Sequence, residues 1–548
     1  GHAEIKGRLD YMISELQRCQ DADGYLSGVV NGRKVWKEIK EGNIRASGFG
    51  LNDGWVPLYN IHKLFAGLRD AYLIGGKSEA KDMLVKLTDW MIRVVENLSE
   101  EQMQDMLRSE HGGLNETFAD VAAITGDKRY LELAHKFSHQ LVLQPLLKKE
   151  DKLTGMHANT QIPKVIGYKR IADLEGNQDW SEAARYFWKT VVEHRSISIG
   201  GNSVREHFHP ATDFSSMLTS EQGPETCNTY NMLRLTKMLY QTSADASFMD
   251  YYERALYNHI LSTINPIQGG FVYFTPMRSG HYRVYSQPQT SFWCCVGSGM
   301  ENHARYGEMI YGHKDKNLYV NLFIPSTLDW NGTMIEQQTA FPEEEGTTLV
   351  VSPEMGNKAF AMHVRIPKWA DKSLVRVTVN GEQQNLDIKD GYAVVNRTWK
   401  KGDKLHIAMP MHLYTIGLPD GSANYSVMYG PVVLASSLGK QQQDGMYADD
   451  SRGGHIANGP RWSLQNMPVI VGDKDKVIEK IQKVEGKPLT FKLSGVYPDT
   501  YEGMILQPFY QLHECRYMVY WPVITEQELA ARLEHLEQEE KARIALDA

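Results

Sequence analysis

Apolar residues recur every three or four positions through the first ~310 residues, which is the spacing of a buried helix face. Polar or Gly-rich turns, for example at 75–77 and 125–128, separate the periodic runs. This pattern predicts a helical domain over residues 1–315. The predicted helices are Tyr59–Leu73, Ala80–Leu98, Asn115–Ile124, Arg129–Leu147, Gln161–Leu174, Trp180–Val192, Glu225–Tyr240, Phe248–Leu261 and Gly299–Tyr311.

The near-constant alternation of helix, turn and helix favours helix pairs that close into an (α/α)6 barrel. An open solenoid is the alternative, but the sequence shows no solenoid consensus. Two long non-helical insertions, Ser196–Ser220 and Asn265–Val296, would also interrupt a regular array. Insertions on one face of a scaffold are where binding sites are commonly built, so we expect functional residues there.

After about residue 316 the hydrophobic period changes to two, which indicates β-strands. Hairpin signals occur at 380–382 (NGE) and 389–391 (KDG). Residues 316–436 are therefore predicted to form an antiparallel β-sandwich. The predicted strands are Leu318–Phe323, Thr348–Ser352, Phe360–Ile366, Leu374–Val379, Tyr392–Val395, Lys404–Met409 and Tyr425–Leu434.

The remaining residues are less regular. Within 437–525 we expect a long polar loop over 437–470, then strands near Thr490–Leu493 and Tyr517–Pro522. The last segment, 526–548, is predicted to hold a charged helix, Glu526–Leu546. The fold class is thus a multidomain α + β chain with a helical barrel followed by a β-sandwich.

The net charge of the chain limits the kinds of molecule that it is expected to bind. A net charge of −8 argues against nucleic acid or an anionic membrane as the main partner. No run approaches the roughly 20 apolar residues that a membrane span requires. The start, Gly1-His2, is typical of a tag remnant, so it carries no information about export. Neither the charge nor the composition determines the oligomeric state.

Five cysteines make a sparse and odd set, which excludes a disulfide scaffold. The adjacent pair Cys294-Cys295 could form a disulfide with itself only under strain, and two neighbouring thiols suit a soft metal better. For Cys19 and Cys515 we expect simple packing in the interior.

Glu225-Thr226-Cys227 and Cys294-Cys295 together offer three thiols and a carboxylate, a ligand set that zinc accepts. Glu225 and Cys227 fall where a helix is predicted to begin, and Cys294-Cys295 fall in a loop that leads into the next helix. Both positions are expected to lower the thiol pKa values. Cysteines are also often buried without any metal. Because this spacing is not that of a zinc finger, both interpretations stay open at this point.

The segment Ser198–Phe208 (SIGGNSVREHF) contains Glu206 after a Gly-Gly turn. A carboxylic acid in such an insertion could act as a general acid and base. A surface glutamate in a charged loop is the simpler interpretation, and Glu221 is a second candidate acid nearby in the sequence.

These stretches, SIGG-x-S-x-x-E-x-F, then E-T-C, then F-W-C-C-V-G-S-G, resemble the β-L-arabinofuranosidases of glycoside hydrolase families 127 and 146. The resemblance covers the helical domain in order and continues into the sandwich. It extends over 54–68, 111–121, 156–164, 250–261 and 269–277.

The resemblance implies a retaining glycosidase with a zinc-bound cysteine nucleophile, Cys294, and a thioglycosyl intermediate. Glu206 would be the acid and base. The remaining implied roles are zinc ligands at Glu225, Cys227, Cys294 and Cys295, and sugar-binding residues at His111, His157, Glu253 and Tyr273.

The expected reaction is removal of terminal β-L-arabinofuranose from plant glycans such as arabinan, pectin or hydroxyproline-linked arabinosides. A periplasmic, cell-surface or secreted location in a bacterium is expected, with the cytoplasm as the alternative. Two other functions remain open. One is a carboxylate-only hydrolase or lyase on the same barrel with structural zinc, and the other is a non-catalytic carbohydrate-binding protein.

Overall fold

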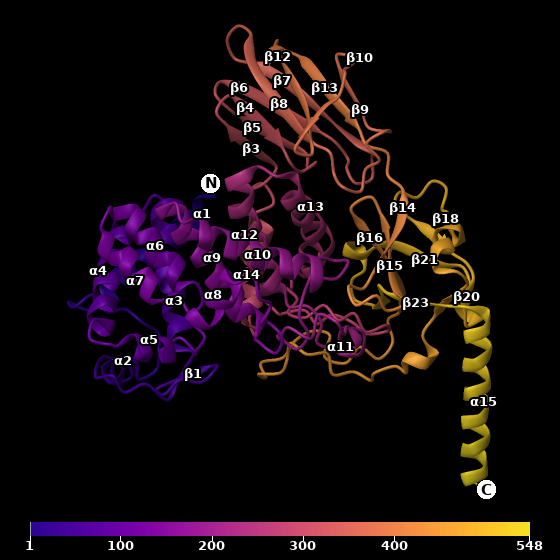
Figure 1. Cartoon of the computed structure of the whole chain (residues 1–548), viewed down its shortest axis with the longest axis horizontal. Coiled ribbons are helices and arrows are strands. Elements are labelled where there is room, and N and C mark those ends of the chain that lie inside the picture. The colour runs from indigo at the N-terminus through magenta and orange to yellow at the C-terminus, as the bar shows by residue number, and fades with distance from the viewer. Residues whose placement is uncertain (1, 548) are drawn as a thin grey trace. The chain divides into compact units, whose positions relative to one another are not determined.

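The computed structural model describes residues 2–547, with the side chains of all of these except 536 and 539–547. The chain forms two compact units, residues 1–190 and 191–548. Figure 1 shows helices from the indigo to the magenta part of the chain, strands mainly in the orange part, and a helix, Glu526–Asp547, at the yellow end. The predicted change from helical to antiparallel β structure is confirmed. The predicted domain boundaries after residues 315, 436 and 525 stay predictions.

The N-terminal unit is built from helices around an apolar core. Phe118 of one helix lies edge-on to Phe65 at 5.1 Å and to Phe137 at 5.0 Å between ring centres. Its elements are α1 Ala3–Cys19, α2 Gly32–Lys40, β1 Gly50–Leu51, β2 Gly54–Trp55, α3 Pro57–Leu73, α4 Ser78–Val95, α5 Glu100–Met106, α6 Leu114–Thr125, α7 Lys128–Lys136, α8 Gln140–Leu147, α9 Ala158–Glu175 and most of α10 Gln178–His194.

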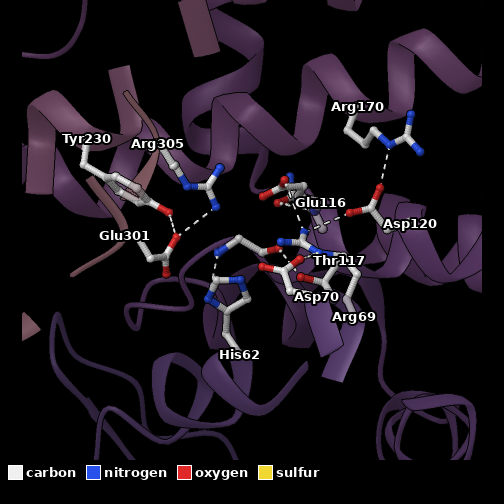
Figure 2. A network of polar contacts seen from close by, with 12 residues as sticks. His62, Arg69, Asp70, Glu116, Thr117, Asp120, Arg170, Tyr230, Glu301 and Arg305 are labelled. Carbon is white, nitrogen blue, oxygen red and sulfur yellow. Dashed lines mark hydrogen bonds and ion pairs between the residues drawn. The ribbon is translucent and has the colours of Figure 1, made fainter. Parts of the chain in front are cut away.

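A buried charge network joins three of these helices (Figure 2). Arg69 of α3 contacts Asp70 at 2.8 Å, Glu116 of α6 at 3.4 Å and Asp120 of α6 at 2.9 Å. Arg170 of α9 contacts Asp120 at 2.6 Å. Each carboxylate has a guanidinium partner within the network, so the charges are matched without an added ion.

The sequence-based prediction for the N-terminal unit fails at one helix and omits three others, α1, α2 and α5. The single helix predicted over Arg129–Leu147 is wrong, because the chain breaks between α7 and α8. At the break Phe137 is fully buried, and the hydroxyl of Ser138 donates to the carbonyl of Ala134 at 3.0 Å. Helix α1 was not predicted, since Ile13 is its only buried residue and its apolar period is weak.

The C-terminal unit begins with the remaining helices: α11 Ser215–Thr219, α12 Thr226–Ser243, α13 Ala246–Ala255 and α14 Cys294–Ala304. Helix α13 continues as η1 Leu256–Ile260, a π-helical turn, and η2 Leu261–Thr263. The predicted bounds Gly299–Tyr311 are wrong, since α14 starts five positions earlier (299 − 294) and ends at Ala304. Gly299 permits close packing of α14 against Phe271, because a Cβ at position 299 would lie 2.8 Å from that ring.

Two mainly antiparallel sheets follow and share one apolar core; in the first, Asn317–Val320 pairs in parallel with Lys358–Arg365. Val320, Met362 and Val395 of the first sheet pack with Ile335, Leu349 and Ile407 of the second. The first sheet has the order β11-β12-β8-β4-β3 and the second β10-β9-β13-β7-β6-β5. The strands are β3 Tyr311–Lys314, β4 Asn317–Val320, β5 Ser326–Asp329, β6 Thr333–Gln338, β7 Gly346–Pro353, β8 Lys358–Arg365, β9 Arg376–Val379, β10 Glu382–Gln383, β11 Asp387–Lys389, β12 Tyr392–Trp399 and β13 Asp403–Ala408.

A third sheet contains ten strands and a long connection. The strand predicted over Tyr425–Leu434 is in fact two strands, separated at Gly430, whose φ is 53°. The elements are β14 Leu413–Gly417, β15 Asn424–Tyr429, β16 Val432–Gly439, η3 Leu464–Asn466, β17 Val469–Val471, η4 Lys474–Lys480, β18 Ile481–Lys483, β19 Phe491–Leu493, β20 Val496–Tyr497, η5 Asp499–Tyr501, β21 Met504–Pro508, η6 Phe509–Gln511, β22 Arg516–Met518, β23 Trp521–Ile524 and the helix α15 Glu526–Asp547.

The expected polar loop is largely confirmed, because residues 440–463 contain neither helix nor strand. Among the described helices, none combines the length and the apolar character needed to cross a bilayer.

Candidate active site

Four acidic side chains converge in the C-terminal unit, and they are the predicted zinc ligands Glu225, Cys227, Cys294 and Cys295. One ligand atom from each lies within 4.8 Å of the others. The sulfurs of Cys227 and Cys295 are 3.1 Å apart, and Glu225 Oε1 lies 3.7 Å from the Cys295 sulfur and 3.9 Å from that of Cys294. Three of the four are buried and Cys294 is half-buried. All five cysteines of the chain are free thiols.

Two helix N-termini carry these ligands. Glu225 is the N-cap of α12 and Cys227 lies in its first turn. The entry to α12 is fixed by Thr226, whose backbone N–H donates to the carbonyl of Tyr273 at 3.0 Å. Cys294 and Cys295 begin α14 and follow its N-cap, Trp293. The prediction that the cysteine pair precedes the helix is therefore wrong: the pair is part of its first turn.

The expected lowering of the thiol pKa values is also wrong for the protein without a metal. Burial raises the pKa of Cys227 and of Cys295 well above the ordinary value, and neighbouring thiols raise it further. Desolvation thus outweighs the favourable helix N-termini. Several thiols this close together can lose their protons only if a cation lies between them. Three sulfurs and one carboxylate oxygen are a donor set that fits zinc.

Glu206 is held in a tight turn of the loop before α11. Val204 and His207 exchange two backbone hydrogen bonds of 3.0 Å across it. Ser203, Arg205 and Glu206 have φ values of 71°, 49° and 66°, a conformation that is unusual for residues other than glycine. Such strain is found mainly where the surrounding structure fixes a functional side chain. The hydroxyl of Tyr273 donates to Glu206 Oε1 at 2.5 Å.

The second candidate acid, Glu221, has a different environment. Its carboxylate lies 3.6 Å from the guanidinium of Arg461. The negative charge of Glu221 also acts to raise the pKa of Arg278 and of His281. Glu206 instead faces the uncharged hydroxyl of Tyr273. Glu206 thus contacts Tyr273 and lies within 4.8 Å of Glu225, whereas Glu221 pairs with Arg461; which of the two is the acid stays a prediction.

Aromatic side chains surround the cysteines. Tyr273 packs against Phe274 with ring centres 4.6 Å apart and against Trp293 at 6.2 Å. Burial, followed by the charges of Glu225, Cys294, Cys295 and Glu206, raises the pKa of Tyr273, which keeps its hydroxyl protonated. Tyr273 is thus a neutral hydrogen-bond donor that lies near both the thiols and Glu206.

Sequence reasoning missed one residue of this site. His455, from the connection 440–463, lies 4.3 Å from Tyr273 and 5.6 Å from Trp293 between ring centres. The only local signal is Gly453-Gly454 before it, which indicates a tight turn but no partner. Periodicity cannot detect a contact made by an irregular segment some 180 residues away along the chain (455 − 273).

The predicted pocket histidines lie in the N-terminal unit. His111 is fully buried, its Nδ1 is 3.0 Å from the carbonyl of Ser109, and burial lowers its pKa. His157 is the N-cap of α9 and accepts from the N–H of Thr160 at 3.2 Å. Its ring lies edge-on to Phe49 at 5.2 Å. Their roles in sugar binding stay predictions.

Glu253, the other predicted sugar ligand, is only 1% exposed. One carboxylate oxygen pairs with Arg365, and the other accepts from the indole N–H of Trp369 at 3.0 Å. Arg365 also contacts Asp250 at 2.7 Å. These contacts fasten α13 to the sandwich strand β8. The observed environment is that of a structural ion pair, while a contact with arabinose stays a prediction.

Comparison with known proteins adds family relationships. The profile "Beta-L-arabinofuranosidase, GH127 catalytic domain" matches residues 1–308, more than half of the chain. The GH127 middle domain matches residues 317–411, and a domain of unknown function matches 414–523. A "Non-reducing end beta-L-arabinofuranosidase" of Bifidobacterium longum subsp. longum is 22% identical over 492 residues, covering 79% of this chain and 72% of that protein.

Solved structures show the same fold. A GH127 β-L-arabinofuranosidase from Geobacillus stearothermophilus T6 matches with a TM-score of 0.68 at 20% identity, over 95% of this chain and 87% of that one. A second GH127 β-arabinofuranosidase matches with a TM-score of 0.68 at 19% identity, over 96% and 86%. These matches confirm the predicted class, a helical barrel followed by β domains.

Proposed function

Since the chain belongs to the GH127 β-L-arabinofuranosidase family and is a glycoside hydrolase, we propose that it removes terminal β-linked L-arabinofuranose from plant glycans with retention of configuration. The observation that carries the proposal is the convergence of Glu225 and three thiols within 4.8 Å. Such a set has no evident structural use without a metal, and a retaining glycosidase needs a nucleophile beside an acid.

Glu225, Cys227, Cys294 and Cys295 would hold one zinc ion. When bound, zinc supplies the positive charge that keeps these thiols ionised at neutral pH and lowers the basicity of their sulfurs. Cys294 is the least buried of the four, so its sulfur is the one that a substrate can reach.

In the first step the Cys294 sulfur forms a bond to the anomeric carbon as the bond to the glycosidic oxygen breaks. Glu206, as the carboxylic acid, gives its proton to that oxygen, and the aglycone departs as an alcohol. Tyr273 fixes the orientation of Glu206 through its 2.5 Å hydrogen bond. The product of this step is arabinose linked to Cys294 through a C–S bond.

In the second step Glu206, now a carboxylate, takes a proton from a water molecule. The water oxygen attacks the anomeric carbon, the C–S bond breaks, and Cys294 leaves as a thiolate. Each step inverts the anomeric carbon, so the released arabinose has the β configuration. The carboxylate partner used by most retaining glycosidases is replaced here by sulfur.

The experiment that tests this function compares para-nitrophenyl β-L-arabinofuranoside with its α-anomer. We expect turnover of the β-anomer only, with β-arabinose as the first product in proton NMR spectra. First release of α-arabinose would indicate direct attack by water and remove Cys294 as the nucleophile. Binding of arabinosides without turnover would support a carbohydrate-binding protein instead. The aglycone, whether arabinan, pectin or hydroxyproline, is then identified by comparing the corresponding oligosaccharides.

A further inference from the structure

Residues 441–462, called the strap below, form a closed loop whose two ends are held together. The guanidinium of Arg516 donates to the carbonyl of Gln441 and to that of Pro460, both at 2.9 Å. The hydroxyl of Tyr282 donates to the carbonyl of Asp444 at 2.5 Å and accepts from the N–H of Gly459 at 2.8 Å. Arg516 and Tyr282 are both buried, so the base of the strap is anchored in the interior.

The body of the strap lies along the segment that leads to the cysteine pair. Tyr285 and the strap exchange two backbone hydrogen bonds, from Tyr285 to Met446 at 2.8 Å and from Ala448 to Tyr285 at 2.9 Å. The side chain of Gln287 donates to the carbonyl of Ala448 at 2.7 Å. Ala448 and Ala457 pack with Tyr282, Val284 and Trp293. The strap therefore has a fixed path against the N-terminal side of α14.

The tip of the strap carries His455 into the aromatic surroundings of the site. Its ring centre is 4.3 Å from Tyr273, 5.6 Å from Phe274 and 5.6 Å from Trp293. Ile456 packs against the same cluster. Tyr273, which packs against His455, also donates to Glu206, and Ile456 packs in one cluster with Cys294, so the imidazole lies near the acid and the nucleophile alike.

The state of the ring fits a binding role. The ring is half-buried among Tyr273, Phe274 and Trp293. A neutral imidazole offers one N–H donor and one acceptor nitrogen, which matches a sugar hydroxyl. A ring that stands near both reacting groups also stands near the sugar whose bond is cleaved.

We infer that His455 is a sugar-binding residue of the active site, and that the region matched as a domain of unknown function, residues 414–523, completes the catalytic pocket through the strap. The identity of the sugar as arabinofuranose rests on the proposed function. The contribution of His455 is a hydrogen bond to a hydroxyl of this sugar, made beside the Tyr273–Glu206 pair.

The test uses the full chain loaded with zinc and three variants: His455→Ala, His455→Gln and, as a matched control, His313→Ala. His313 is exposed on β3 and belongs to the same compact unit. We measure kcat and KM on para-nitrophenyl β-L-arabinofuranoside, the affinity for L-arabinose by calorimetry, the zinc content and the Tm. His455→Ala should raise KM and weaken L-arabinose binding, each by about tenfold, because a hydrogen-bonding group of the site is lost.

His455→Gln retains a donor and an acceptor, so it should recover much of the loss, and His313→Ala should match the unsubstituted protein. Zinc content and Tm should stay unchanged in all three variants. Unaltered arabinose binding in His455→Ala would overturn the inference. So would a loss that occurs only together with equal losses of zinc and of Tm.

The calorimetric arm separates this inference from the proposed function. If the unsubstituted protein binds L-arabinose but hydrolyses no β-arabinofuranoside, the proposed function fails while the role of His455 is still decided by the affinities. If hydrolysis occurs and His455→Ala is unaffected in KM and in affinity, only the role of His455 fails. A further variant, Gln287→Ala, removes a side-chain contact to the strap and should raise KM by a smaller factor than His455→Ala.

Discussion

Two buried polar clusters in the C-terminal unit invite comparison. In the first, Glu253 and Asp250 share the guanidinium of Arg365, so the cluster contains its own cation. In the second, the carboxylate of Glu225 and the thiols of three cysteines lie within 4.8 Å of one another. The first cluster resembles the Arg69 network of the N-terminal unit, where carboxylates again face arginine.

The comparison shows how a buried cluster of acidic residues can be recognised as a structural cluster or as a metal site. Acids that are matched by arginine within the same cluster need no added cation, and removing one partner leaves an uncompensated buried charge. The cysteine cluster contains four acidic residues and no basic one among them, and burial raises the pKa of Cys227 and Cys295. This set can ionise together only around an added cation, which points to a metal centre.

Removal of the metal should have the largest effect. We expect one zinc per chain in elemental analysis, and a strong chelator should reduce kcat by at least about 10³-fold. The Tm should also fall, because a metal that binds the folded state alone stabilises it. Restored activity on adding Zn²⁺ is the control for irreversible unfolding. Active protein that contains no zinc would show that the cysteine cluster, like the cluster around Arg365, has a structural role only.

Glu206→Gln should reduce kcat/KM by about 10²–10⁴-fold on substrates with poor leaving groups, since it removes the proton donor. Zinc content should stay at one per chain, because Glu206 is not among the four converging ligands. The matched control is Glu221→Gln, which alters a carboxylate paired with Arg461 and should change kcat/KM by no more than about twofold. If Glu221→Gln is the inactive variant, the acid has been misassigned.

Glu253→Gln should lower the stability of the fold. Loss of the charge that faces the buried Arg365 should lower the free energy of unfolding by about 3 kcal/mol, seen as a reduced Tm. The exposed pair Arg8–Glu4 provides the control, and Glu4→Gln should change stability by less than about 0.5 kcal/mol. A raised KM at unchanged Tm would contradict the structural role and restore Glu253 as a sugar ligand.

Tyr273→Phe should have the smallest effect, a reduction of kcat/KM of about tenfold, because the hydrogen bond that orients Glu206 is lost. Tyr230 makes a comparable hydroxyl–carboxylate contact with Glu301 on α14. Tyr230→Phe should therefore leave kcat/KM unchanged. Equal losses in both variants would show that the Tyr273 contact has no special part in catalysis.

Much of the site could be predicted because it lies in short motifs at helix starts. Glu225-Thr226-Cys227 and Cys294-Cys295 are separated by 67 positions (294 − 227), yet the chemistry of zinc links them. Glu206 was a candidate from its insertion alone, and the family resemblance then added Tyr273; the two side chains are in contact, while their roles stay predictions.

Other features depend on contacts that no local pattern contains. Burial of Glu253 against Arg365 requires the packing of a helix on a strand more than a hundred positions later (365 − 253). Cys19 was expected in the interior but is exposed, because it ends a helix that buries only Ile13. His455 lies in a loop whose polar composition predicts solvent exposure, and distant residues such as Arg516 and Tyr282 give it a fixed place.

The central claim is that the sulfur of Cys294 attacks the sugar, and peptide mapping tests it most directly. The Glu206→Gln variant is mixed with para-nitrophenyl β-L-arabinofuranoside, whose leaving group needs little protonation, so the covalent intermediate should accumulate. Mass spectrometry should find the mass of one pentose residue on the peptide that contains Cys294-Cys295, and Cys294→Ser should lose this adduct together with most of the activity. An adduct on a peptide whose only nucleophile is a carboxylate, or full activity in Cys294→Ser, would contradict the account.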